Sequence, residues 1–315
     1  MEIINIIATF CISTILILIS QKIFISKKYI DEITGRSSHN VIATRSGGLA
    51  VYVSISIISV FYYVSGYTIF DYSLLVPLSL LMFLGLYDDV NNVDFKLKFI
   101  FQIIAAKIII DNGLIIDNFH GLLGIFELNR VIAQLFTIFI VVAIINSINF
   151  IDGIDGLAIS VIILFIVLFE FFSDEITPFK NLSIILLASL VPMYYFNFKN
   201  KNKVFLGDSG SLFLGGVVSI YVIYTLTNNY IIKPEFDMHK IAFVISILFY
   251  PIIDIIRVFI IRVSQNKSPF IADKNHIHHI FLKKINKHIL IVALIISISI
   301  LFVIITQVIN KIQDF

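Results

Sequence analysis

The chain has 315 residues, of which 58% are hydrophobic and only 14% are charged, and its mean hydropathy is +0.98. A soluble domain is nearer half apolar and a quarter charged, so this composition excludes an ordinary soluble globular protein and favours lipid as the surrounding solvent. The net charge of +2 says little about partners, no nucleic acid is expected, and the single cysteine, Cys11, argues against disulfides and against a thiolate metal site.

Apolar stretches, each a candidate for a membrane span of about 20 residues, follow one another along the chain. The first, 3–24, has no basic stretch before it and no small-residue cleavage site after it, which predicts a spanning helix and not a removed signal peptide. The others are 48–70, 73–87, 97–111, 130–150, 156–173, 181–198, 210–228, 241–262 and 288–309. The predicted fold is an all-α polytopic membrane protein of about ten transmembrane helices, with nine and eleven as alternatives.

The Lys and Arg residues between these stretches predict how the chain is oriented. Numbering the loops alternately from the N-terminus puts 17 of the 23 Lys and Arg residues on one side. Positive charge marks cytoplasmic loops, so this side is predicted to be cytoplasmic and both termini are predicted to lie outside. Cytoplasmic loops are expected near 23–47, 88–98, 199–209 and 263–287, within one integral membrane domain of residues 1–315.

Five polar clusters fall on this predicted cytoplasmic side. They lie within residues 36–48, 88–98, 146–156, 205–211 and 254–279. Carboxylates beside apolar spans are costly and tend to mark function, and several of them without matched cations indicate a hard divalent ion such as Mg²⁺. Glycine turns let backbone N–H groups approach an anion, and Arg45, Lys96 and Lys98 can hold phosphate charge. Together these features predict phosphoryl transfer at the cytoplasmic surface.

Each cluster also has a purely structural interpretation. The Asp88-Asp89 pair can be a solvated helix end, and Lys199, Lys201 and Lys203 are better explained as cations that reach lipid headgroups. Asp254 and Arg257 lie three residues apart on one helical face, where they can neutralise each other. The convergence of all five clusters on one membrane side favours function over these separate explanations.

Five motifs in this order resemble the polyprenyl-phosphate N-acetylhexosamine-1-phosphate transferases, which are related to the phospho-N-acetylmuramoyl-pentapeptide transferases. The motifs are RSSHNVIATRSGGLAVY (36–52), LGLYDDVNNVDFKLKFIFQ (84–102), NSINFIDGIDGLA (146–158), VFLGDSGSLFLGG (204–216) and SPFIADKNHIHHIFL (268–282). The pattern His276-Ile-His278-His279 is similar to the N-acetylhexosamine branch. Thr44 departs from the proline that the family often has there, which affects only the geometry of the following turn.

The resemblance implies transfer of a sugar-1-phosphate from a UDP-N-acetylhexosamine to undecaprenyl phosphate, with release of UMP, at the start of a cell-envelope glycan such as O-antigen or teichoic acid. It implies that the metal ligand is Asp155, with Mg²⁺ as the ion, Mn²⁺ as an alternative ion and Asp152 as an alternative ligand. The expected catalytic residues are Asp88, Asp89, His278 and His279. The expected substrate-binding residues are Arg45, Lys96, Lys98, Asn146, Asn149, Asp152, Asp208 and His276.

Several alternatives stay open at the level of sequence. The lipid phosphate, whose second pKa is about 6, could attack the donor directly, or Asp88 or Asp89 could act as a nucleophile through a covalent intermediate. A membrane phosphatase or hydrolase would use the same residues. A transporter is less consistent with acidic residues at the cytoplasmic helix ends, and an inactive relative is less consistent with the presence of Asp88, Asp89, Asp155, His278 and His279. The expected location is the bacterial cytoplasmic membrane, with lipid as a partner and a homodimer as one assembly.

Overall fold

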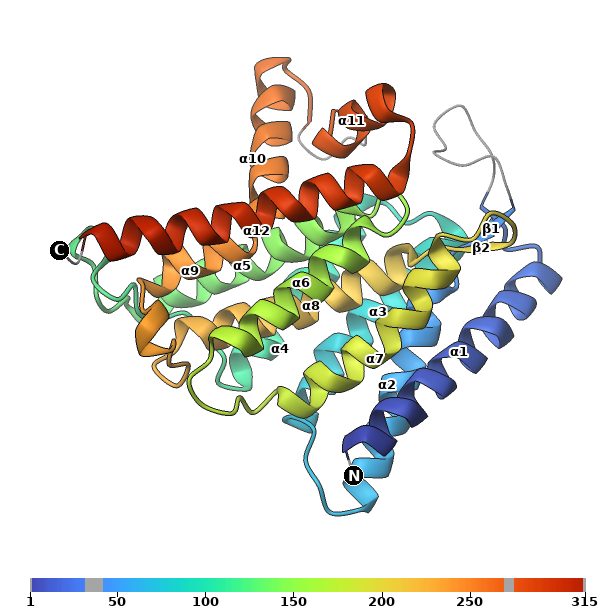
Figure 1. The fold of residues 1–315 in the computed structure, drawn as a ribbon, viewed down its shortest axis with the longest axis horizontal. Coiled ribbons are helices and arrows are strands. Elements are labelled where there is room, and N and C mark those ends of the chain that lie inside the picture. The colour runs from blue at the N-terminus through green and yellow to red at the C-terminus, as the bar shows by residue number, and fades with distance from the viewer. Residues whose placement is uncertain (1, 32–41, 269–274, 314–315) are drawn as a thin grey trace.

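The computed structural model describes residues 2–31, 42–268 and 275–313, and within these ranges it is built almost entirely of helices (Figure 1). Parts of the first and fifth sequence motifs, residues 36–41 and 269–274, lie outside the described residues. The helices are α1 (Glu2–Ser26), α2 (Gly47–Val64), α3 (Leu75–Asn91), α4 (Phe95–Asp111), α5 (Arg130–Ile151), α6 (Leu157–Phe172), α7 (Lys180–Asn197), α8 (Gly207–Leu226), α9 (Lys240–Ile247), α10 (Phe249–Ser264), α11 (Ile277–Ile285) and α12 (His288–Gln313). Short 3₁₀ turns lie at Tyr72–Leu74, Leu122–Gly124 and Pro234–Phe236.

Each predicted apolar stretch is mostly helical, as expected where no water is present to satisfy backbone groups, although residues 65–70 lie beyond α2 and 241–262 is divided between α9 and α10. In the described part of the chain, six helices are long and apolar enough to cross a membrane: α1, α2, α3 with its preceding 3₁₀ turn, α5, α8 and α12. The count becomes seven if α9 and α10 are taken as one bent span, and α6 is apolar but shorter. The chain is therefore a polytopic helical membrane protein.

The predicted continuous helix over 241–262 is wrong. The chain breaks at Leu248, and α9 and α10 enclose a bend of 81°. Pro251 in the first turn of α10 has no N–H to bond to a carbonyl of the preceding helix, and its ring disfavours helix just before it. The segment 263–287, expected to be a loop, contains α11 (Ile277–Ile285). As a result α10 points away from the bundle while α12 lies along it (Figure 1).

Helix α8 is the centre of the bundle, and nearly all of its residues are buried. It packs against α2, α3 and α5, which approach it closely at glycines. A Cβ added at Gly48 would lie 2.0 Å from the Gly210 nitrogen, and one added at Gly85 would lie 2.2 Å from the Asp208 carbonyl oxygen. Those two glycines are therefore needed because the backbones of α2 and α3 touch the first turn of α8.

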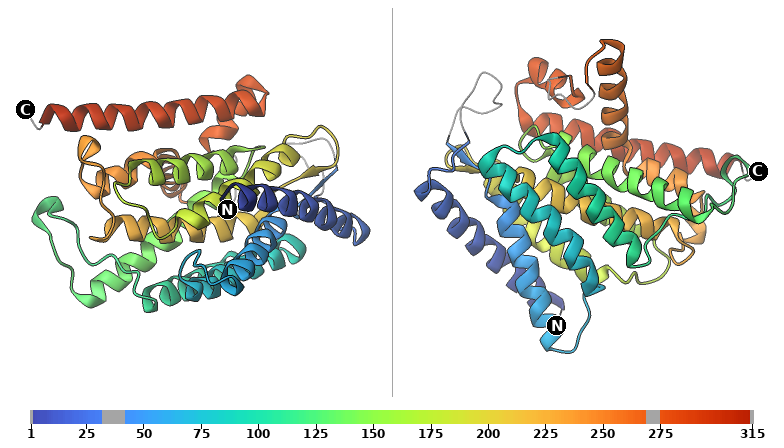
Figure 2. Two further views of the ribbon diagram at one scale, coloured as in Figure 1. Left: turned by 60° about the horizontal axis from the view of Figure 1, so that its bottom comes forward. Right: turned by 180° about the vertical axis from the view of Figure 1, so that it is seen from behind.

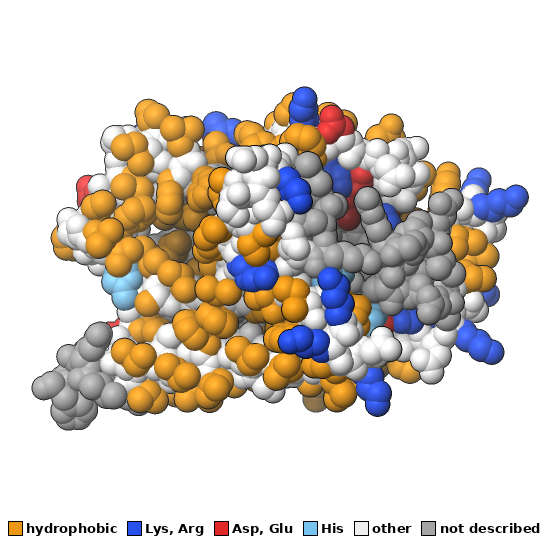
Figure 3. Space-filling view, turned by 90° about the horizontal axis from the view of Figure 1, so that it is seen from above, with side chains coloured by type: hydrophobic (Ala, Val, Ile, Leu, Met, Phe, Trp, Pro, Cys, Tyr) orange, Lys and Arg blue, Asp and Glu red, His pale blue; other side chains and the backbone are white. Residues whose placement is uncertain are grey.

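Two further views show the helices running back and forth between two ends of the molecule (Figure 2). At one end, β1 (Ala43–Thr44) pairs in parallel with β2 (Lys203–Val204), joining the segment before α2 to the segment before α8. Lys and Arg side chains gather over the half of the face that contains this end, and apolar side chains cover most of the other half (Figure 3). The segments before α2 and before α8, which the sequence predicted to lie on one side of the membrane, thus share one end of the fold.

Candidate active site

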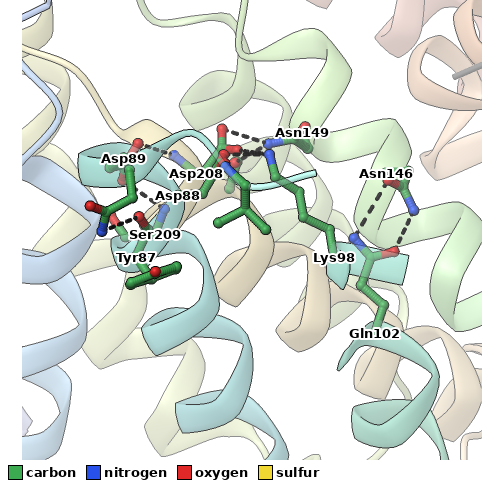
Figure 4. Close-up of polar contacts among 12 residues, drawn as sticks. Tyr87, Asp88, Asp89, Lys98, Gln102, Asn146, Asn149, Asp208 and Ser209 are labelled. Atoms are coloured by element: carbon green, nitrogen blue, oxygen red, sulfur yellow. Dashed lines mark hydrogen bonds and ion pairs between the residues drawn. The ribbon is translucent and has the colours of Figure 1, made fainter. Parts of the chain in front are cut away.

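Four polar side chains from four helices meet in one cluster (Figure 4), close to the start of α8, which directly follows β2. The Lys98 ammonium of α4 lies between the carboxylates of Asp88 in α3 and Asp208 in α8, and its Nζ is 2.5 Å from Asp208 Oδ2. The Asn149 amide of α5 donates to Asp208 Oδ1 at 3.1 Å and to Ser211 Oγ at 2.8 Å. One lysine therefore links two carboxylates that lie 120 positions apart in the sequence.

Asp89 faces a different partner from its neighbour. Its two carboxylate oxygens accept hydrogen bonds from the backbone N–H groups of Asp208 and Ser209, at 2.9 and 3.0 Å (Figure 4). The first N–H groups of a helix have no partner within that helix, and Leu206, at the N-cap position of α8, has no side chain that can accept them. Asp89 therefore acts as the cap of α8 from α3.

Arg45 and Asp152 lie within electrostatic range of this cluster. Burial lowers the pKa of Arg45, but the carboxylates of Asp31, Asp89 and Asp208 outweigh burial and raise that pKa above its ordinary value. Arg45 Nη2 lies 2.6 Å from Asp31 Oδ1. Burial raises the pKa of Asp152 well above its ordinary value, and the negative charges of Asp208 and Asp89 raise it further. The positive charge of Arg45 opposes this rise, so burial is the main reason that the neutral form of Asp152 is favoured.

Asp155 occupies the turn between α5 and α6 and has its own cationic partners. Its Oδ2 forms an ion pair with Lys203 of β2 and lies 2.9 Å from His288 Nδ1 at the start of α12. Burial raises the pKa of Asp155, but the hydrogen bonds from His288 and Lys203 outweigh it and lower the pKa. Lys203, expected to reach lipid headgroups, is instead a partner of a site carboxylate, so that prediction is wrong.

The residues present fit a divalent cation held by few protein ligands. Asp155 Oδ1 is buried and has no hydrogen-bond partner among the described residues, so one carboxylate oxygen is available to a cation. Among those same residues there is no group of three or more His, Cys, Asp or Glu side chains that could enclose a metal. Mg²⁺ is commonly bound by one or two carboxylates together with substrate phosphates, and this arrangement suits that mode of binding.

The histidine motif packs against the same turn. A Cβ added at Gly153 would lie 2.6 Å from His278 Nε2 and 3.1 Å from two ring atoms of His279, so a side chain at this position would displace the histidine rings. His278 is fully buried, and burial, followed by the positive charge that His279 and His276 can carry, lowers its pKa well below the ordinary value. The three histidines thus lie beside the Asp152–Asp155 turn.

Two of the predicted substrate-binding residues lie away from the centre of the cluster. Asn146 Nδ2 donates to the Gln102 side-chain oxygen and to the Val142 carbonyl, both at 2.7 Å, so its amide is engaged within the bundle (Figure 4). The side chain of Lys96 is exposed and forms no hydrogen bond or ion pair with any described residue. The structure therefore does not bring Lys96 into the cluster.

Other functional candidates were not predicted from the sequence. Gln102, Lys203 and His288 each contact a predicted site residue. Asp254 and Arg257 do not neutralise each other: Asp254 bonds to His276 and to the backbone of Ile277, whereas Arg257 donates to the Asn275 carbonyl at 2.5 Å. A sequence signal existed for Gln102 and Lys203 because both lie within or beside a polar motif, but none indicated His288.

The chain is similar in sequence to a known family of membrane transferases. Residues 71–226 match the model of glycosyl transferase family 4. The chain is 32% identical over 287 residues to the probable undecaprenyl-phosphate N-acetylglucosaminyl 1-phosphate transferase of Bacillus subtilis, covering 88% of this chain and 77% of that protein. It is 27% identical over 290 residues to the undecaprenyl-phosphate alpha-N-acetylglucosaminyl 1-phosphate transferase of Salmonella typhi, covering 89% and 76%. It is 28% identical over 289 residues to the decaprenyl-phosphate N-acetylglucosaminephosphotransferase of Mycobacterium leprae, covering 82% and 71%.

Proposed function

Because this chain belongs to glycosyl transferase family 4, together with its undecaprenyl-phosphate N-acetylglucosaminyl 1-phosphate transferase relatives, we propose that it transfers a sugar-1-phosphate from a UDP-N-acetylhexosamine to undecaprenyl phosphate. The products are the diphosphate-linked lipid and UMP, and the lipid product begins a cell-envelope glycan. The observation that carries the proposal is the cluster of Asp88, Lys98, Asn149 and Asp208 at one end of a helical membrane bundle, in a chain similar to proteins named undecaprenyl-phosphate N-acetylglucosaminyl 1-phosphate transferases.

In the proposed reaction an oxygen of the lipid phosphate attacks the sugar-bearing phosphorus of the donor. The bond from that phosphorus to the bridging oxygen breaks, and UMP leaves with the electron pair. Much of the lipid phosphate is a dianion at neutral pH, since its second pKa is about 6, so the reaction does not need a strong base. Asp88 positions the acceptor or takes a remaining proton, and Lys98 and Arg45 offset phosphate charge during the attack.

The cation we propose is Mg²⁺, held by Asp155 through Oδ1, which has no hydrogen-bond partner among the described residues, and Asp152 is close enough to interact electrostatically with Asp155. When bound it offsets the negative charge of the donor diphosphate and of the departing UMP. Lys203 pairs with the other oxygen of Asp155, and His288 Nδ1 accepts a hydrogen bond from the Asp155 backbone N–H at 3.1 Å, so both residues keep this turn in one orientation. Asp89 contributes indirectly, because it holds the first turn of α8 and therefore the position of Asp208.

The location that we propose is the bacterial cytoplasmic membrane, with about ten spans and the site facing the cytoplasm. The charge asymmetry of the loops supports this orientation. The lipid phosphate would then meet the site at headgroup depth, while the water-soluble UDP-sugar would arrive from the cytoplasm. An apolar cleft between helices, leading to Asp88, would admit the prenyl chain from the side.

The experiment measures UMP release by purified protein in detergent with undecaprenyl phosphate, Mg²⁺ and a panel of UDP-N-acetylhexosamines. Wild type should release UMP only with both lipid and Mg²⁺, and the donor that supports release identifies the sugar. Asp155→Asn should lower the rate of UMP release by about 100-fold or more, which is the usual effect of removing one group that stabilises charge developing in the transition state. Asp111→Asn, a change at an exposed i,i+4 pair with Lys107 far from the site, is the matched control.

Two outcomes would contradict the proposal. UMP release that does not depend on the lipid would indicate a hydrolase, and no release with any donor from well-folded protein would indicate an inactive relative. Retention of a radioactive sugar phosphate on the protein in the absence of lipid would favour the covalent route over direct attack.

A further inference from the structure

Helix α10 has an apolar outer side and a polar inner side. Its outer residues Ile253, Ile256 and Phe259 are about half exposed. Its inner side carries Tyr250, Asp254 and Arg262, all buried, even though two of them are charged and α10 diverges from the bundle after an 81° bend (Figure 1). Buried charged groups are costly unless they are paired, so the partners of this inner side indicate why these residues are present.

The partners are the histidines of the 276–279 motif. His276 Nδ1 lies 2.6 Å from Asp254 Oδ2, and the backbone N–H of Ile277 donates to Asp254 Oδ1 at 2.8 Å. On the other side of the same ring, Arg262 Nη2 lies 3.4 Å from His276 Nε2. An arginine can only donate, so Nε2 must accept, and the proton of a neutral His276 lies on Nδ1 facing Asp254. The contacts of His276 with Arg262 on one side and Asp254 on the other therefore select one tautomer of the His276 ring.

Tyr250 acts on the next histidine of the motif. Its hydroxyl lies 3.0 Å from His278 Nδ1, one helical turn of α10 away from the Asp254 contact. His278 Nε2 is buried, has no hydrogen-bond partner among the described residues, and faces Gly153 in the turn that carries Asp152 and Asp155. If the hydroxyl donates to Nδ1, the proton of the neutral ring lies on Nε2, which then offers an N–H group to an anion at that turn.

We propose that Tyr250 and Asp254 are positioning residues, which act through His278 and His276 to present the Nε2–H of His278 to a phosphate oxygen of the nucleotide-sugar. The inference rests on the proposed function for the identity of that anion, but the tautomers that it assigns are properties of the protein alone. Outer partners of functional histidines commonly determine which ring nitrogen carries the proton. The broken helix α9–α10 thereby has a role: its bend brings the inner side of α10 over the histidine motif.

A role limited to fold stability is the competing explanation, and double-mutant cycles distinguish the two. Tyr250→Phe and Asp254→Asn should each lower kcat by about 10- to 100-fold, the usual effect of losing such an outer partner, with KM for the lipid changed less than about threefold. If they act through the histidines, Tyr250→Phe should cause little further loss in a His278→Gln background, and Asp254→Asn little in His276→Gln. Losses that multiply in the double variants would overturn the proposal.

The matched controls are Tyr63→Phe, at an exposed tyrosine of α2, and Asp111→Asn, at the exposed end of α4. Both should leave kcat within about twofold of wild type, because neither residue contacts the site. If kcat and KM of Tyr250→Phe equal those of Tyr63→Phe, Tyr250 is not a positioning residue for His278. The proposed transferase activity would not be affected by that result.

A second measurement does not depend on activity. The chain has seven histidines, and labelling them with ¹⁵N reports the tautomer of each ring by NMR. The His278 signals, assigned by their loss in His278→Gln, should show a proton on Nε2 in wild type and a mixture of tautomers in Tyr250→Phe. If wild type releases no UMP but the His278 tautomers of wild type and Tyr250→Phe are as predicted, the proposed function alone is contradicted. A His278 ring with its proton on Nδ1, or one unchanged by Tyr250→Phe, would contradict this inference alone.

Discussion

Asp88 and Asp89 are adjacent in sequence, yet their carboxylates have separate tasks. Asp88 shares Lys98 with Asp208, so its charge is part of a polar cluster that can respond to a phosphate. Asp89 is bound on both oxygens by backbone N–H groups at the start of α8. Successive residues of a helix point about 100° apart, which is why two neighbouring aspartates at the end of α3 reach different partners.

The capping role of Asp89 predicts a graded loss of stability. Asp89→Ala removes both acceptors of the α8 N–H groups and should lower the free energy of unfolding by about 0.5–2 kcal/mol, the usual effect of losing a cap. Asp89→Asn keeps one acceptor oxygen and should lose less. Thermal unfolding of the purified variants, followed by circular dichroism, measures the difference. Equal destabilisation by both changes would show that the charge of Asp89 matters and the cap does not.

At the scale of elements, the contact of α3 with α8 depends on a glycine. A methyl group at Gly85 would collide with backbone atoms of Asp208 and Ser209, which cannot move without displacing the first turn of α8. At Gly216, on the same pair of helices, the nearest atoms are the side-chain ends of Leu81 and Leu78, at 2.6 and 3.1 Å. Side-chain ends can rotate away, whereas the backbone cannot.

These contacts predict unequal effects from identical changes. Gly85→Ala should destabilise the protein by about 1–3 kcal/mol or more through overpacking and should also abolish UMP release, because Asp208 moves. Gly216→Ala should change stability by less than about 1 kcal/mol, since better helix propensity offsets a small adjustment of leucines. Unfolding temperature and UMP release of the two variants test this. A Gly216→Ala protein as damaged as Gly85→Ala would contradict the distinction.

Much of this architecture was predictable from hydropathy, because each stretch of apolar residues in lipid has helix as its only simple solution. The positions of Asp88, Asp208 and the histidines at one end also followed from alternation of the helices. The break at Leu248 did not: Pro251 was a signal, but Pro192 lies within α7 without ending it. The bonds of His276 to Asp254 depend on how α10 bends, and no local pattern encodes that angle.

At the scale of the whole molecule, the proposed orientation makes a prediction that needs no enzyme assay. Lys201 and Asn228 are exposed near opposite ends of the bundle. After Cys11 is replaced by Ser, an impermeant maleimide applied to intact cells should label Asn228→Cys and spare Lys201→Cys, because positively charged loops stay in the cytoplasm. Permeabilised cells, in which both cysteines should react, are the control. The opposite labelling pattern would contradict the proposed orientation.

The burial of α8 has a consequence for how the protein is made. Its main neighbours α2, α3 and α5 all precede it in the chain, so the ribosome delivers the surrounding helices before the central one. When α8 leaves the translocon it meets a partly assembled ring and exchanges lipid for protein along nearly its whole length. Asp208 can then meet Asp89 and Lys98 before α10 and the histidine motif, which follow α8 in the chain, pack against the site. Insertion in chain order therefore brings the carboxylate cluster together before the histidines complete the site.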